Sequence, residues 1–139
     1  MDAKILEAVR GDSRYAYEAY EFVCDAVTFT QDHLGRSPRP NDPDDANYHV
    51  GAEELLRGTC ELALREFGMM APLVFSFWGI HETDDIGNIV FNLIHLDRLS
   101  QSDQDDPEDF HDAFNIEQAL MDGFQLTIQP QLSRKVAER

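Results

Sequence analysis

The sequence HETDD, residues 81–85, places one imidazole and three carboxylates in five consecutive positions. Oxygen donors with one imidazole are ligands that hard divalent ions accept in proteins. Five consecutive residues cannot all converge on one ion, however, so further ligands would have to come from elsewhere. The alternative is a helix start, in which Thr83 is the N-cap and Asp84 and Asp85 complement the helix dipole. We favour the helix start.

A second pair with metal-ligand spacing is His49 and Glu53. The two residues are four positions apart, so they would share one face of a helix that begins early enough. A site needs a second recognisable pair of ligands, and the sequence offers none. It also contains no nucleophile motif and no glycine-rich phosphate loop. We therefore expect no catalytic residue, no metal site and no cofactor.

Aromatic side chains are the other residues that could form a site. The spacing predicts that Phe75 lies away from the main apolar side of its helix and that Phe91 lies outside the main apolar arc of its own. A second buried face would explain both residues, and so would an exposed patch that contacts protein. We name Phe75, Trp78 and Phe91 as the candidate interaction surface.

The composition limits the classes of protein that fit. With 139 residues the chain is long enough for one domain with its own core. Its 27 acidic and 11 basic residues give a net charge of −16, which repels nucleic acid and anionic membranes. The N-terminus lacks the features of an export signal. The longest apolar-rich stretch has twelve residues, whereas a transmembrane helix needs about 20. Together with only two cysteines, Cys24 and Cys60, this predicts a cytoplasmic protein with reduced thiols.

Hydrophobic periodicity predicts the helices that position these residues. They cover residues 3–9, 15–34, 52–67, 71–78 and 84–98. The segment 35–48 is an acidic, proline-rich loop. In the helix 71–78, Pro72 fits the first turn and Gly79 ends the helix. Its large apolar residues cluster on one side: Met70, Leu73, Val74, Phe77 and Trp78. The helix 84–98 has the widest apolar arc, which indicates a central position.

Three helices separated by tight turns, followed by candidate strands, are the order of a winged helix. The wing would cover residues 99–116, and the alternating segment 124–129 is a further strand candidate. We predict a single, mainly helical α+β domain over residues 1–139. It has a winged-helix-like three-helix core at 52–98, a small β region after that core, an additional amphipathic N-terminal helix and a frayed tail at 130–139.

Several stretches carry a resemblance to a known group of proteins. They are YEAYEFV (17–23), HVGAEELL (49–56), REFG (65–68), WGI (78–80), DIGNIVFNLI (85–94) and EDF (108–110). On these stretches the chain resembles an uncharacterised family of short bacterial proteins with no assigned activity. The resemblance implies no catalytic or binding residue, and residues 117–139 lie outside it.

Three functions follow as hypotheses. We predict a non-catalytic protein-interaction or assembly module, with a protein partner or self-association as a homo-oligomer. One alternative is a winged-helix-type nucleic-acid-binding regulator, and the other is a small metal-dependent enzyme using His81 or His49. Against nucleic acid, Asp84 and Asp85 lie where a recognition helix would approach phosphates, and Arg98 is the only strong cation on the exposed face of that helix. We therefore expect neither nucleic acid nor membrane among the partners.

Overall fold

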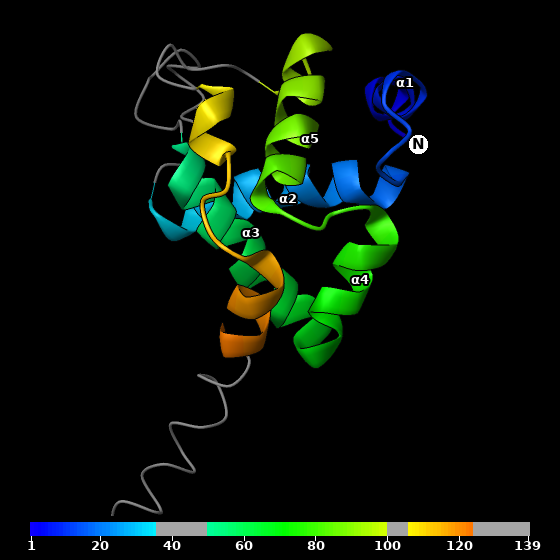
Figure 1. Ribbon diagram of the computed structural model, residues 1–139. Helices are drawn as coiled ribbons and strands as arrows, with labels where there is room; N and C mark the ends of the chain where they lie inside the picture. The colour runs from blue at the N-terminus through cyan, green and yellow to red at the C-terminus, as the bar shows by residue number, and fades with distance from the viewer. Residues whose placement is uncertain (36–49, 100–105, 124–139) are drawn as a thin grey trace, which may run out of the picture.

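The computed structural model describes residues 1–35, 50–99 and 106–123. In these ranges the protein is mainly helical, and no residue of them is in a strand. The α-helices are α1 (Ala3–Gly11), α2 (Tyr17–His33), α3 (Ala52–Phe67), α4 (Ala71–Trp78) and α5 (Thr83–His95), with the 3₁₀ helices η2 (Gly68–Met70) and η3 (Pro107–Phe110). Residues 116–123 are also helical. Figure 1 shows α5 standing across α2, with α1 and α4 on one side of it and η3 on the other.

The hydrophobic core is built around α5, as its wide apolar arc predicted. Ile86, Ile89 and Leu93 are fully buried in one cluster with side chains from α1, α2, α3 and α4. Elements on every side of α5 contact it, which is why its apolar arc is so wide. The predicted helices 52–67 and 71–78 have the bounds of α3 and α4, and the other three differ from theirs by one to three residues.

The WGI turn at residues 78–80 lies between α4 and α5. It also contacts the residue that precedes α2. Gly79 has a φ of 90° and ends α4 in the left-handed conformation, which glycine adopts without a steric penalty. The backbone amide of Ala16 donates a 3.1 Å hydrogen bond to the carbonyl of Trp78. The turn therefore holds the N-terminal end of α2 as well as ending a helix.

The helix start at α5 differs from the prediction, because Thr83 is not the N-cap. The N-cap is Glu82, and the carboxylate of Asp85 accepts hydrogen bonds from the backbone amides of His81 (2.8 Å) and Glu82 (3.0 Å). Thr83 is fully buried, and its hydroxyl donates to the carbonyl of Phe110 at 2.7 Å. The Thr83 hydroxyl therefore bonds to η3 and does not cap α5. Capping rules use only neighbouring residues, so they do not predict this contact.

The predicted wing is not confirmed in the part of it that the structure describes. Residues 106–116 form η3 and turns, and the helical segment 116–123 follows. Phe110 is buried against α5, where a side chain on Gly87 would collide with its ring. Phe114 lies instead beside α3 and Ile116 beside α4, so the three apolar residues contact different helices and do not form one face of a hairpin. The loop at 36–48, residues 100–105, the strand candidate 124–129 and the tail 130–139 lie outside the described residues.

Candidate functional site

The three aromatic residues predicted to form an interaction surface do not lie together on the surface. Phe75 is only 1% exposed, and its ring packs against Phe22 and Trp78 at centroid distances of 5.9 and 6.1 Å. Trp78 is half-buried in the same cluster. Phe91 packs against Phe110, at a centroid distance of 6.0 Å. Phe75 therefore belongs to the second buried face that was the alternative interpretation.

The opposite side of the same helix carries the exposed apolar side chains. Met69 is 71% exposed, Met70 50%, Leu73 49% and Phe77 80%. We call these four residues the α4 stripe. Met69, Leu73 and Phe77 follow one another at intervals of four residues, so they share one face of η2 and α4.

The packing of α4 explains why this face is outside. The helix is buried through Ala71 and Phe75, which point into the core at 0% and 1% exposure. The sequence grouped Leu73 and Phe77 with Trp78 as one apolar side, but it could not tell which side packs. One feature of the sequence indicated an exposed apolar face, namely that residues 69–78 are apolar on almost every side. A short helix at the edge of a domain leaves one side in water, so part of this apolar surface is exposed.

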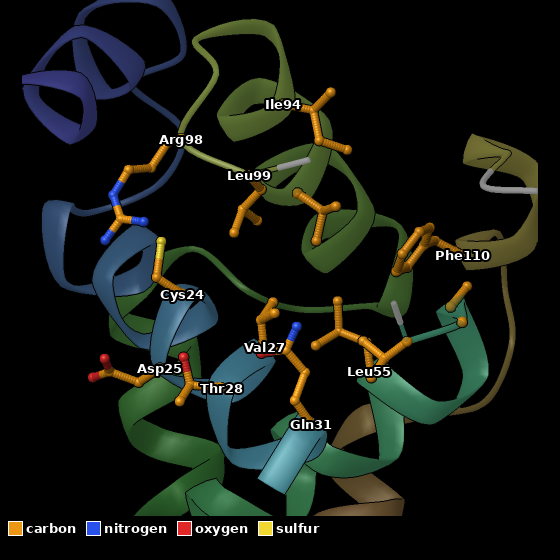
Figure 2. A pocket seen from close by; sticks show the side chains of 14 residues that line it. Cys24, Asp25, Val27, Thr28, Gln31, Leu55, Ile94, Arg98, Leu99 and Phe110 are labelled. Carbon is orange, nitrogen blue, oxygen red and sulfur yellow. The ribbon is translucent and has the colours of Figure 1, made fainter. Parts of the chain in front are cut away.

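A cavity of about 280 Å³ lies between α2, the start of α3, α5 and η3 (Figure 2). Its apolar lining is Val27, Val50, Leu55, Val90, Ile94, Leu99 and Phe110. Figure 2 shows Cys24 and Arg98 pointing toward each other at one end, with Phe110 at the other end. The guanidinium of Arg98 is already bound to the carboxylate of Asp2 at 2.8 Å. The cavity thus has a mixed lining, since Asp25, Thr28 and Gln31 also face it, and its arginine is paired.

The cysteines of the core do not supply an activated nucleophile. Burial raises the pKa of the Cys24 thiol to about 11 and that of Cys60 to about 12. Both are free, and at neutral pH both are protonated thiols, whereas the thiolate is the reactive form. Neither thiol is therefore activated as a nucleophile by its surroundings.

The carboxylates of the HETDD segment hold the fold together. Asp85, beyond its two amide partners, accepts a 2.7 Å hydrogen bond from the hydroxyl of Tyr15. Asp84 accepts from the amide of Asp112 at 2.9 Å and pairs with the ring of His111 at 2.6 Å. Within the described ranges, no group of three or more His, Cys, Asp or Glu side chains is placed to hold a metal ion. His49 lies outside those ranges.

The polar side of α5, which was expected to be exposed, is packed against the turn between α1 and α2. The amide of Asn88 donates to the Tyr15 hydroxyl at 3.0 Å, and that of Asn92 donates to Asp12 at 2.9 Å and to the Tyr20 hydroxyl at 3.1 Å. A hydrogen bond from Arg14 helps to lower the pKa of Asp12 to about 2. No local pattern predicts this network, because each asparagine is more than 70 residues from its partners in the chain.

The contact between His111 and Asp84 predicts a dependence on pH. The hydrogen bond that the His111 ring donates to Asp84 raises the pKa of His111 above its ordinary value of about 6.5. The pair therefore stabilises the fold fully below about pH 6.5, and this contribution is lost as the pH rises through the raised pKa. A titration of the His111 ring followed by NMR should show the raised pKa, and Asp84→Asn should bring it back toward the ordinary value. An unchanged titration in Asp84→Asn would contradict the assignment.

No helix in the described part of the chain is long and apolar enough to span a membrane. Comparison with models of protein families, with curated proteins and with solved structures found no match. No known site is thereby carried over to these residues. The bacterial origin that the resemblance implied stays a prediction.

Proposed function

We propose that the chain is a non-catalytic protein-interaction module that binds its partner through the α4 stripe. The observation that carries the proposal is the exposure of Met69, Leu73 and Phe77 in a row on one helix face. Other large exposed apolar residues in the described ranges are scattered, such as Leu34 at the end of α2. Single exposed apolar side chains need no explanation, whereas a contiguous group of them is typical of an interaction site.

The residue types of the α4 stripe also favour protein as the partner. Phenylalanine and methionine are enriched at protein interfaces. Two adjacent methionines, Met69 and Met70, give the stripe flexible and polarisable side chains that adapt to different partners. We also propose that the protein is cytoplasmic. Its thiols Cys24 and Cys60 are free, and free cysteines fit the reducing cytoplasm.

Site-specific photo-crosslinking tests this function. The photoreactive residue p-benzoylphenylalanine is placed at position 77 and, in a control protein, at position 34, and each protein is illuminated in a lysate. Leu34 is a matched control, since it is 41% exposed and lies at the far end of α2 from the Trp78 contact. We expect discrete adducts from position 77 that position 34 does not give. No adduct, or the same adducts from both positions, would overturn the proposal.

A homo-oligomer and a nucleic-acid-binding regulator would each be recognised by a different measurement in solution. A homo-oligomer would appear as a concentration-dependent increase in mass by light scattering. The winged-helix-type regulator would bind labelled duplex DNA at about 50 mM salt, where binding driven by phosphate contacts is strong. The engagement of Asn88 and Asn92 with the α1–α2 turn supports the expectation of no such binding.

A further inference from the structure

The charge of the protein narrows the kind of partner that the α4 stripe fits. With 27 acidic residues against 11 basic ones, most carboxylates have no basic side chain to pair with. Of the five described arginines, those at positions 14, 57, 65 and 98 are each bound to a carboxylate, of Asp12, Glu53, Glu61 and Asp2 respectively, and Arg10 on α1 is not. The surface that a partner meets is therefore dominated by negative charge.

Acidic residues also lie near the α4 stripe, one of them in a groove beside α4 and two others close to its ends along the chain. Glu66 is exposed and lies three residues before Met69. Glu117 is exposed and lines a small groove beside α4, of about 110 Å³, together with Pro72 and Ser76. Glu18, also exposed, is two residues beyond Ala16, whose amide is bonded to Trp78 at the end of α4.

The cations nearest to the stripe in the chain are engaged elsewhere. Arg65 is bound to Glu61 at 3.3 Å, and its guanidinium lies over the ring of Phe29. Arg14 is bound to Asp12 at 2.7 Å. Neither Arg14 nor Arg65 is therefore an unpaired cation that could neutralise the carboxylates near the α4 stripe.

From this arrangement we infer that the α4 stripe, with Glu117 beside α4 and with Glu18 and Glu66 close to it along the chain, docks a basic amphipathic helix of another protein. This inference rests on the proposed function. Met69 to Phe77 covers about 12 Å of helix, at about 1.5 Å per residue. A partner helix therefore meets it with apolar residues spaced three or four apart over about two turns, which is how helices occupy apolar grooves.

Lysine and arginine on the other positions of that helix face the carboxylates near the stripe. Opposite charge accelerates association and excludes acidic competitors. A second copy of this chain is a poor occupant by the same physics, because two molecules of charge −16 repel each other.

The test uses the full-length protein and fluorescently labelled model peptides of about 15 residues, a length at which helices begin to form in water. The first peptide is an amphipathic helix of leucine and lysine. The second has glutamate in place of lysine, and the third has the first peptide's composition in a scrambled order without an apolar face. Binding is measured by fluorescence anisotropy at about 0.05 and 0.3 M salt, between which screening increases markedly.

The wild-type protein should bind the first peptide at least about tenfold more tightly than either of the others, and more weakly at the higher salt. Phe77→Ser and Leu73→Ser should each weaken this binding about tenfold or more, and Leu34→Ser should leave it unchanged. Glu66→Gln together with Glu117→Gln should reduce its salt dependence. Because Phe77 is 80% exposed, Phe77→Ser should keep the wild-type melting temperature.

Several outcomes would overturn the inference. Equal binding of the ordered and scrambled basic peptides would indicate general attraction to an acidic protein, and equal binding by Phe77→Ser would place the peptide elsewhere. Dimers abolished by Phe77→Ser would assign the stripe to a second copy. A crosslink from position 77 to residues 124–139 of the same chain would assign it to the C-terminal segment. Discrete crosslinked partners without binding of the basic peptide would overturn the partner class alone, whereas absence of adducts would overturn the proposed function as well.

Discussion

Replacing Leu93 by alanine is expected to lower the free energy of unfolding by about 2–5 kcal/mol. Leu93 is fully buried on α5, in the cluster that also contains Ile86 and Ile89. Truncation removes apolar atoms from the core and leaves a cavity, because helices on several sides of α5 cannot all move inward. A domain of this size has a stability of about 5–15 kcal/mol, so the change removes a large share of it.

Urea unfolding followed by circular dichroism measures this effect. The midpoint should fall while the slope stays the same, since the mutation changes stability and not the surface exposed on unfolding. Leu34→Ala is the matched control, because Leu34 is 41% exposed and its truncation leaves no buried cavity. Similar midpoints for the two variants would show that the α5 face is not the centre of the core.

The helices could be predicted from the sequence because their signals are local. Proline at the first turn of α4 and the left-handed Gly79 at its end mark that helix without reference to any neighbour. The bounds of α3 follow equally from its periodicity and from Gly68. The central place of α5 could also be predicted, because a helix with a wide apolar arc buries that arc only by contacting other elements on several sides.

The orientation of each helix could not be predicted in the same way. Whether α4 buries Phe75 or Phe77 depends on how α2 and α3 are placed, which no local pattern encodes. For the same reason Thr83 was predicted as a cap and instead binds Phe110, 27 residues away. The structure accordingly buries the predicted residue Phe75 and leaves Phe77, on the other side of the same helix, exposed.

The hydrogen bonds of Asn88 and Asn92 show the same limit for polar residues. A polar strip on a helix is usually in water, and here it meets the hydroxyls of Tyr15 and Tyr20. Only the three-dimensional arrangement distinguishes a solvated strip from a polar contact between helices. The helix face that a winged helix would turn toward DNA is here part of the contacts between helices.

Replacing Gly79 by alanine is expected to destabilise the protein by about 2–6 kcal/mol, from two penalties of about 1–3 kcal/mol each. The first is backbone strain, because Gly79 has a φ of 90°. The second is steric, because a Cβ atom there would collide with the carbonyl oxygen of Arg14. This carbonyl cannot move freely, since the neighbouring Tyr15 is bonded to Asp85 and Ala16 to Trp78.

Chemical unfolding of three variants separates the two penalties. Gly11→Ala is the control, because its Cβ would meet nothing within 4 Å and its φ is not positive. It should be close to wild type. Gly79→Asn should be intermediate, since asparagine tolerates positive φ but keeps the clashing Cβ. If Gly79→Ala were as stable as Gly11→Ala, the turn would not be fixed by Arg14. The α4–α5 turn would then not tie α4, and with it the exposed stripe, to the start of α2.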